Sequence, residues 1–266
     1  MRVLLDRAEV VYSGDGRETT PALAPTTLSV DAGSCVAVVG PTGSGKTTLL
    51  DVMSGLRAPT SGTARLDPGG PGPELRRGVG LVAQFPEEQF FEETVFDEVA
   101  FGLRRSGVEK DEAAARVERA LRRSGLDPVA FSEREPARLS AGEARRAAIA
   151  GILVLERPFL LLDEPTAGLD PGNCGMVFDL IRAERAAGTG VVFVTHDLGV
   201  ALELAERVIV MVGGRVVGDD VPARVMEDVD GLASIGLEPP IEYALVAALE
   251  RRGALSAAAV RRVLLG

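Results

Sequence analysis

Tryptophan is absent from the 266-residue sequence, and tyrosine, cysteine and histidine occur only two, two and one times. The cysteines, Cys35 and Cys174, are too far apart to resemble a metal-binding pair. No apolar run approaches the ~18–20 residues that cross a bilayer, and charged residues follow Met1 too soon for a signal peptide. Acidic residues outnumber basic residues by 39 to 29, which disfavours a general nucleic-acid binder. We therefore expect a cytoplasmic protein that does not bind nucleic acid.

Lysine is scarce as well, because Lys46 and Lys110 are the only lysines among 29 basic residues. Lys46 lies in residues 40–47, GPTGSGKT, which match the phosphate-loop pattern G-x-x-x-x-G-K-[ST]. An apolar, β-branched run at 35–39 precedes this loop and a helical pattern follows it, as the motif requires. A dinucleotide-binding loop would need a glycine where Thr48 stands. The segment therefore predicts a site for nucleotide phosphates.

The chemistry of such a loop follows from its residue types. Glycines allow successive backbone N–H groups to point at phosphate oxygens, and the following helix adds its positive N-terminal end. Lys46 supplies a compact charge, for which the broad guanidinium of arginine is a poor replacement. Thr47 offers a hydroxyl to Mg²⁺.

Polar side chains end two further runs that are typical of buried strands. Phe159–Leu162 leads into Asp163 and Glu164, and Val191–Thr195 leads into His196, the only histidine. Asp163 suits Mg²⁺ binding through water, and Glu164 suits a base that orients an attacking water. A neutral imidazole beside the phosphate loop would bridge a γ-phosphate and a backbone carbonyl. Taken alone, the two acids are equally consistent with a strand that ends in solvent.

The remaining patterns predict an α/β fold. Antiparallel strands are expected within residues 1–33, a helix at Met176–Ala187, and a hairpin at Val208–Val217. Apolar stripes predict tail helices at Ile241–Arg252 and Leu255–Leu265. The fold class is therefore a parallel sheet around the phosphate loop with an antiparallel β subdomain, an inserted helical subdomain and a helical tail.

The inserted helical subdomain is predicted from Phe85 to about Leu139, where the composition changes. Its clearest helix pattern is Asp111–Ser124. The segment holds five of the nine phenylalanines, and acidic residues surround them. These rings are explained either as a small local core or as an acid-rimmed groove for a partner helix.

A helix is predicted to open at Leu139–Glu143. Ser140 and Glu143 form an S-x-x-E capping box, so on this segment alone a structural helix start explains both residues.

Taken in order, the motifs resemble those of the ATP-binding subunits of ABC transporters, whose core is a RecA-like P-loop NTPase fold. The corresponding motifs are Walker A at Gly40–Thr47, the Q-loop at Gln84, the LSGGQ-type signature at Leu139–Glu143, Walker B at Phe159–Glu164, the D-loop at Gly168–Asp170 and the switch histidine at His196. The signature motif is what distinguishes this family from other P-loop ATPases.

The resemblance implies ATP and Mg²⁺ as cofactors and a role for each matching residue. The implied ATP-binding residues are Tyr12, which stacks on adenine, and Gly40, Pro41, Thr42, Gly43, Ser44, Gly45, Lys46, Thr47 and Thr48. The implied metal ligands are Thr47, Gln84 and Asp163, and the implied catalytic residues are Glu164, His196 and Gln84. The residues implied to contact the ATP of a second ATPase subunit are Ser140, Ala141, Gly142 and Glu143, with Asp170 in the D-loop.

Residues 84–91, 94–102, 148–151 and 234–240 are similar to the energy-coupling factor (ECF) subfamily, which powers uptake of vitamins, cobalt or nickel. The resemblance implies a homo- or heterodimer of ATPase subunits, bound to an integral membrane coupling protein and a substrate-binding membrane subunit. The subunit would lie peripherally on the cytoplasmic face of the cell membrane.

The resemblance also implies a division of the chain. Residues 1–230 form the ATPase domain, with the helical subdomain at approximately 85–141 inserted in it. Residues 231–266 form a C-terminal extension that is a candidate dimerisation region.

Two hypotheses concern particular residues. Ala141 stands where the family usually has glycine, so we expect a slowed or asymmetric ATPase. Glu87, Glu88 and the nearby phenylalanines are expected to receive the arginine-bearing coupling helices of the membrane partner.

Three alternatives stay open. The chain is also compatible with the ATPase of another ABC importer or exporter. A soluble ABC ATPase that acts on DNA, ribosomes or cluster assembly is a second alternative, although the chain lacks the usual coiled-coil insert, tandem halves or basic surface. A P-loop kinase would not explain the order of Q-loop, signature and Walker B.

Overall fold

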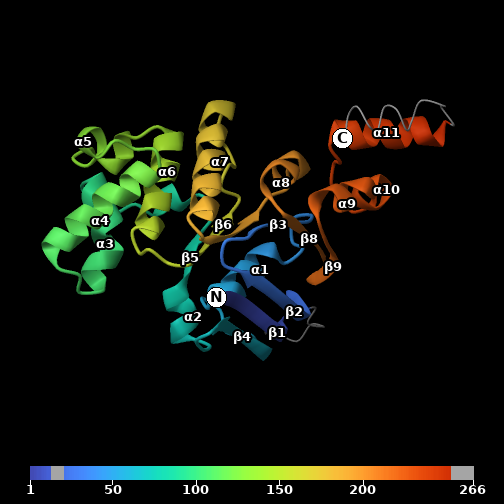
Figure 1. Cartoon of the computed structure of the whole chain (residues 1–266), viewed down its shortest axis with the longest axis horizontal. Coiled ribbons are helices and arrows are strands. Elements are labelled where there is room, and N and C mark those ends of the chain that lie inside the picture. The colour runs from blue at the N-terminus through green and yellow to red at the C-terminus, as the bar shows by residue number, and fades with distance from the viewer. Residues whose placement is uncertain (13–20, 253–266) are drawn as a thin grey trace.

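The computed structural model describes residues 1–12 and 21–252. The strands are β1 (Arg2–Val10), β2 (Leu23–Asp31), β3 (Cys35–Val39), β4 (Ser61–Asp67), β5 (Val79–Val82), β6 (Phe159–Asp163), β7 (Gly190–Val194), β8 (Arg207–Val212) and β9 (Arg215–Asp220). The α-helices are α1 (Lys46–Met53), α2 (Pro73–Gly78), α3 (Val95–Arg105), α4 (Lys110–Arg123), α5 (Pro128–Phe131), α6 (Ala141–Leu153), α7 (Pro171–Ala186), α8 (Leu198–Leu204), α9 (Pro222–Glu227), α10 (Val229–Ser234) and α11 (Ile241–Arg251). Two short 3₁₀ helices are η1 (Pro86–Gln89) and η2 (Pro136–Arg138). Figure 1 shows α3–α5 and α9–α11 at opposite ends of the molecule, with the main sheet between them.

The main sheet has the strand order β5-β6-β7-β3-β8-β9, and its pairs are parallel except for the β8–β9 hairpin. Strands β3, β6 and β7 are buried along their whole length, as expected for a parallel sheet covered on both faces. Along β3, Cys35 and Val39 face one hydrophobic core, and Val36 and Val38 face the other. The carboxyl ends of these strands therefore meet at one edge, where the sequence placed its candidate residues.

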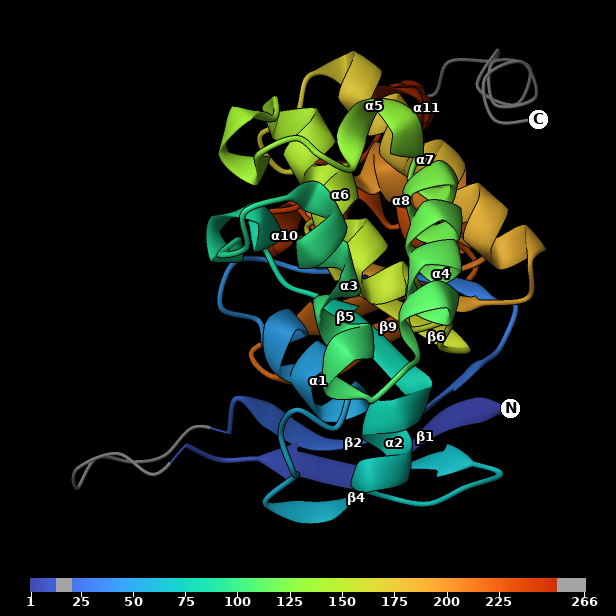
Figure 2. The same cartoon turned by 90° about the vertical axis from the view of Figure 1, so that its left-hand side faces the viewer.

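A separate antiparallel sheet, in the order β2-β1-β4, forms the base of the molecule in Figure 2. Its inward side chains share a core with α1 and with one face of the main sheet. The predicted α/β fold with a parallel core and an antiparallel β part is thus confirmed.

Helices α3, α4 and α6 pack on one another beyond β5. Helix α4 spans nearly the same residues as the helix predicted at Asp111–Ser124. Some phenylalanines of this region lie in a local core, and others are exposed as a groove for a partner would require. Phe90 and Phe96 pack partly buried against the core. Phe91 is 63% exposed and its ring meets that of Phe101 edge-on, at 4.8 Å between centroids.

Two helix predictions differ from the structure in extent. Helix α7 begins at Pro171 rather than Met176, because Asp170 caps its first turn and proline is well suited to a first helical position. In the tail, α11 matches the helix predicted at Ile241–Arg252, whereas Leu255–Leu265 lies outside the described residues. Within residues 1–12 and 21–252, every helix is too short or too polar to span a bilayer.

Candidate functional site

The phosphate loop connects β3 to α1, and two of its glycines are sterically required. A Cβ on Gly40 would lie 2.2 Å from the carbonyl oxygen of Met211, and one on Gly45 would lie 2.3 Å from that of Ala22. Gly45 also has a left-handed φ of 98°, and it precedes α1 without any side-chain cap. The first N–H groups of α1 therefore have no capping side chain and can serve as anion donors.

Lys46 folds back over this loop. Its Nζ donates to the carbonyl oxygens of Gly40 and Pro41, at 2.7 and 2.9 Å. Burial lowers the pKa of its ammonium group, while the nearby Glu164 and Asp163 carboxylates oppose that shift. An incoming phosphate would offer this ammonium group a stronger partner than two neutral carbonyls.

Ser44 adds a second indication that the loop receives a polar ligand. Its side chain is 2% exposed, and its Oγ has no hydrogen-bond partner within the described part of the chain. A Cβ on Gly40 would come within 2.7 Å of the same Oγ, so the loop closes tightly around it.

Thr47 and Asp163 meet although one lies in the first turn of α1 and the other at the end of β6. Thr47 Oγ1 donates to Asp163 Oδ2 at 2.7 Å, and Asp163 is only 5% exposed. A hydroxyl beside a buried carboxylate is the oxygen donor set that suits Mg²⁺. Gln84, the third predicted ligand, follows β5 at the same sheet edge but is exposed and does not line the cavity around Lys46.

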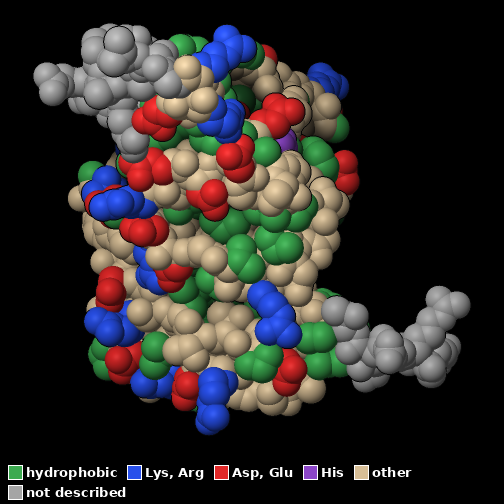
Figure 3. Space-filling model, turned by 90° about the vertical axis from the view of Figure 1, so that its right-hand side faces the viewer, with side chains coloured by type: hydrophobic (Ala, Val, Ile, Leu, Met, Phe, Trp, Pro, Cys, Tyr) green, Lys and Arg blue, Asp and Glu red, His purple; other side chains and the backbone are tan. Residues whose placement is uncertain are grey.

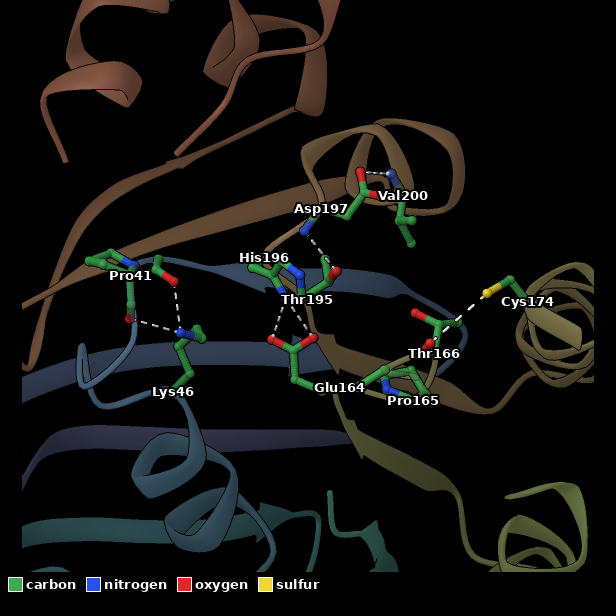
Figure 4. A network of polar contacts seen from close by, with 12 residues as sticks. Pro41, Lys46, Glu164, Pro165, Thr166, Cys174, Thr195, His196, Asp197 and Val200 are labelled. Atoms are coloured by element: carbon green, nitrogen blue, oxygen red, sulfur yellow. Dashed lines mark hydrogen bonds and ion pairs between the residues drawn. The ribbon is translucent and has the colours of Figure 1, made fainter. Parts of the chain in front are cut away.

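Glu164 and His196 are in direct contact, as Figure 4 shows. His196 Nδ1 lies 3.0 and 3.1 Å from the two carboxylate oxygens of Glu164. The Glu164 side chain is 14% exposed and that of His196 is 74% exposed. Glu164 has a left-handed φ of 48°, an uncommon conformation for a residue other than glycine. This backbone turn brings its carboxylate to the histidine at the end of the neighbouring strand.

A cavity of about 890 Å³ opens in front of these groups. Six predicted site residues line it: Gly40, Pro41, Thr42, Lys46, Glu164 and His196. Its other walls are residues 197–199 and the tail segment 236–242. The sequence alone does not predict that these residues belong to the site. In the sequence, residues 234–240 show only a similarity to the ECF subfamily, and nothing links them to the phosphate loop.

Tyr12, the residue expected to stack on adenine, lies next to Thr48. Its hydroxyl is 3.4 Å from Thr48 Oγ1, and the ring is 47% exposed. The guanidinium of Arg57, a residue that the sequence analysis did not select, lies 4.7 Å from the ring centroid. One face of the tyrosine thus carries a cation, in a contact that favours an ordered ring.

The signature residues do not reach this cavity. Ser140 caps α6 and forms the predicted capping box with Glu143. Ala141 is exposed in the first helical turn, and it is not among the residues with a positive φ. Gly142 is buried, and a Cβ there would lie 1.9 Å from Asn173 Oδ1. Packing against the Asn173 side chain therefore favours glycine at 142, whereas position 141 accepts alanine.

Asp170 and the signature helix are linked through one side chain. Asp170 caps α7 by accepting from the N–H of Asn173 at 3.1 Å. Asn173 Oδ1 in turn accepts from Arg146 of α6 at 2.8 Å. The predicted D-loop residue is thus held near the signature segment rather than near Lys46.

The sheet order, the glycine loop and the two acids at the end of β6 define a P-loop ATPase of the ATP-binding-cassette type. A family model described as "ABC transporter" matches residues 23–167. The chain is 40% identical over 263 residues to the energy-coupling factor transporter ATP-binding protein EcfA2 of Symbiobacterium thermophilum, covering 95% of this chain and 90% of that protein.

Two solved structures share the fold at 30% identity. One is cbiO1 from Clostridium perfringens, described as part of the ABC transporter complex cbiONQ, with a TM-score of 0.75 over 92% of this chain and 98% of that one. The other is the ATP-binding cassette MJ0796, a dimer bound to ADP and Pi, with a TM-score of 0.73 over 83% and 98%. The chain belongs to the ABC transporter family, within its group of energy-coupling factor ATP-binding subunits. It is therefore an ATPase of the kind that is coupled to transmembrane transport.

Proposed function

We propose that this chain binds Mg·ATP at residues 40–48 and hydrolyses it to power an energy-coupling factor importer for a vitamin, cobalt or nickel. The observation that carries the proposal is the convergence of Lys46, the Thr47–Asp163 pair and the Glu164–His196 pair around one sheet edge. Each of the three provides a different part of phosphoryl-transfer chemistry.

Binding of ATP uses the loop and its surroundings. Lys46 exchanges the carbonyls of Gly40 and Pro41 for the outer phosphates, and the N–H groups of the loop and of α1 contact the remaining phosphate oxygens. Tyr12 stacks on the adenine ring through the face that Arg57 leaves uncovered.

Mg²⁺ fits beside this site because Thr47 and Asp163 already form a hydroxyl–carboxylate pair. These two residues would hold the ion, with Gln84 as a further ligand from the end of β5. When bound, the ion neutralises negative charge on the β- and γ-phosphates.

Hydrolysis depends on the pair at the ends of β6 and β7. Glu164 accepts a hydrogen bond from the attacking water and orients it toward the γ-phosphate. His196 now donates to Glu164, and it is 74% exposed, so it can turn toward the γ-phosphate when ATP enters. Because Glu164 is largely buried, its interactions with the attacking water and with His196 are stronger than they would be in solvent.

The complete site needs a second ATPase subunit. Residues 140–143 lie outside the cavity around Lys46, which supports their predicted contact with ATP held by another subunit. The dimeric state of the related cassette that binds ADP and Pi supports the same arrangement. Helix α11 exposes Ile241 and Leu245 one turn apart, which supports the extension at 231–266 as a dimerisation region beside the ATPase domain at 1–230.

Membrane subunits would bind on the helical side, near residues 85–141. A cavity of about 860 Å³ there is lined by Phe90, Phe91 and five glutamates. Glu87, one of the residues predicted to receive a coupling helix, is paired with Arg145 within the chain. The exposed Glu88 is the stronger candidate for an arginine of a coupling helix. Such docking would hold the subunit on the cytoplasmic face of the membrane.

On the face shown in Figure 3, acidic and basic side chains are interspersed rather than grouped by sign. Together with the net charge of −10, this supports a protein partner over nucleic acid.

The proposal is tested with the chain purified together with its native membrane partners. Glu164→Gln should lower the ATPase rate on the order of 10²–10⁴-fold, because the water loses its base, while ATP binding persists. Uptake of the transported substrate should stop as well, because it depends on ATP hydrolysis. Glu74→Gln, an exposed substitution on α2 outside the helical side, is the control and should leave both activities unchanged. A wild-type complex that does not bind ATP, or a Glu164→Gln complex that hydrolyses ATP normally, would contradict the proposal.

A further inference from the structure

Arg145 is a buried cation on α6 that none of the assigned roles uses. Its side chain is 1% exposed. Its Nε and Nη2 donate to the two carboxylate oxygens of Glu87, both at 2.8 Å, which is a bidentate pair. A buried arginine with this geometry is a fixed structural connection rather than a mobile surface charge.

The same guanidinium also holds the backbone that follows β6. Nη1 donates to the carbonyl oxygens of Pro165 at 2.8 Å and Glu164 at 3.4 Å, and Nη2 donates to that of Ala167 at 3.3 Å. Arg145 thus contacts the main chain of the proposed catalytic glutamate and, through Glu87, the 3₁₀ helix η1 after Gln84.

Both connected segments contain a residue in an uncommon backbone conformation. Phe85 has a φ of 50° and Glu164 has a φ of 48°. Left-handed conformations of residues other than glycine persist only where the surroundings hold them. Arg145 is part of the surroundings of both, since its guanidinium carbon also lies 5.6 Å from the centroid of the Phe85 ring.

We propose that Arg145 is a positioning residue for ATP hydrolysis. Together with Glu87, it holds the turn that directs the Glu164 carboxylate toward His196. The inference rests on the proposed function, because it assigns Arg145 a role in that same reaction. A force applied to η1, the 3₁₀ helix beside the proposed membrane-facing cavity, would reach the Glu164 backbone through the Glu87–Arg145 contacts.

The charge state of the bridge is favourable at neutral pH. Burial would raise the pKa of the Glu87 carboxyl, but its hydrogen bonds and the charge of Arg145 outweigh burial and hold the pKa below its usual value. Glu87 is therefore an anion under physiological conditions, and both of its oxygens are available to the guanidinium.

A bridge that merely stabilises the fold would make the same contacts, so the experiment separates the two roles. Glu87→Gln keeps the shape of the side chain and removes the ion pair. In the full complex, we expect kcat to fall about tenfold while the KM for ATP changes less than about twofold. In the Glu164→Gln background, where no carboxylate needs positioning, the same change should alter the residual rate less than about twofold.

A matched control is the bidentate pair of Arg123 with Glu184, in which the carboxylate is the buried partner and which links α4 to α7 away from the site. Glu184→Gln should lower the melting temperature without changing kcat. Arg145→Lys, which keeps a charge but loses the fork, should resemble Glu87→Gln.

The outcomes are distinct. An unchanged kcat for Glu87→Gln, or an equal fall in the wild-type and Glu164→Gln backgrounds, would overturn the positioning role. A wild-type complex without Glu164-dependent ATPase activity would instead refute the proposed function itself.

Discussion

The two parts of the candidate ATP site differ in how much of each a single chain supplies. In the phosphate part, residues 40–48 meet Asp163, Glu164 and His196 through contacts made within the chain. In the signature part, residues 140–143 begin α6 and form their capping bonds with one another, away from that cavity. The first part is preformed within the chain, whereas the second is an exposed helix start.

The difference follows from the fold. The phosphate part lies on the carboxyl ends of parallel strands, which the sheet gathers at one edge. The signature part lies at the start of α6, whose position relative to neighbouring segments is set by side chains such as Arg145 and Arg146. We infer that the phosphate part determines ATP affinity and that the signature part determines when hydrolysis proceeds.

The largest expected effect comes from disabling each part separately. Asp163→Asn should weaken Mg²⁺-dependent ATP binding by about 10- to 100-fold, because the neutral amide beside Thr47 lacks the negative charge that binds Mg²⁺.

Ser140→Arg should leave ATP binding by the single chain within about twofold. It should reduce hydrolysis by the complex at least ~100-fold, because the helix start is misplaced. Equilibrium binding of a nucleotide with and without Mg²⁺, beside steady-state hydrolysis, measures both.

A mixing experiment sharpens the same contrast. If a complex contains two copies of this chain, combining Lys46→Ala with Ser140→Arg copies leaves one site with an intact loop and an intact signature, so hydrolysis should return. Melting temperatures control for loss of the Ser140 cap, which stabilises α6 by about 1 kcal/mol. If Ser140→Arg weakened ATP binding as much as Asp163→Asn does, the two parts would belong to one site in one chain.

An intermediate effect is expected at the adjacent positions 141 and 142. A Cβ at Gly142 would lie 1.9 Å from Asn173 Oδ1, which is held by Arg146 and is not free to move away. Gly142→Ala should therefore lower stability by about 1–2 kcal/mol, seen as a fall of several degrees in the melting temperature.

Ala141→Gly is the matched substitution in the opposite direction. Because the Ala141 methyl is exposed and the backbone is unstrained, its removal should leave the fold intact and raise the ATPase rate of the complex by less than about fivefold. An unchanged rate would remove the hypothesis that this methyl slows the enzyme.

The phosphate part could be predicted from the sequence because its residues follow short apolar runs. Parallel strands bring their ends together, so Thr47, Asp163 and His196 could be grouped without knowledge of any side-chain position. The same reasoning predicted the α/β fold, since the short, apolar runs at β3, β6 and β7 are typical of strands in a buried parallel sheet.

The parts of the site that the sequence did not predict depend on packing between segments that are far apart in the chain. Arg145 looks like any arginine in an arginine-rich helix, and only the structure brings it to Glu87 and Pro165. The wall at 236–242 is far from the phosphate loop in sequence, and it reaches the cavity only because the tail folds back across β8 and β9. Periodicity predicts elements and their faces, but it contains no information on which distant turn lies against which helix.

The smallest expected effect concerns the acid at the start of the signature helix. Hydrogen bonding to the Ser140 backbone, together with the Arg134 charge, outweighs burial and holds the pKa of Glu143 below its ordinary value of 4.5. Because the pKa of Glu143 is lower in the folded than in the unfolded protein, its carboxylate stabilises the fold at pH values above the unfolded pKa. This stabilisation disappears as the pH falls through the pKa of the folded protein.

Glutamine at this position can still accept the capping bond but carries no charge. The stability difference between wild type and Glu143→Gln should therefore be about 0.5–1 kcal/mol near pH 7 and should shrink below pH 4.5. Thermal melts across that pH range would measure it, while single-chain ATP binding at pH 7 should be unaffected. A difference that grows toward acid pH would show that Glu143 is not the anion that caps α6.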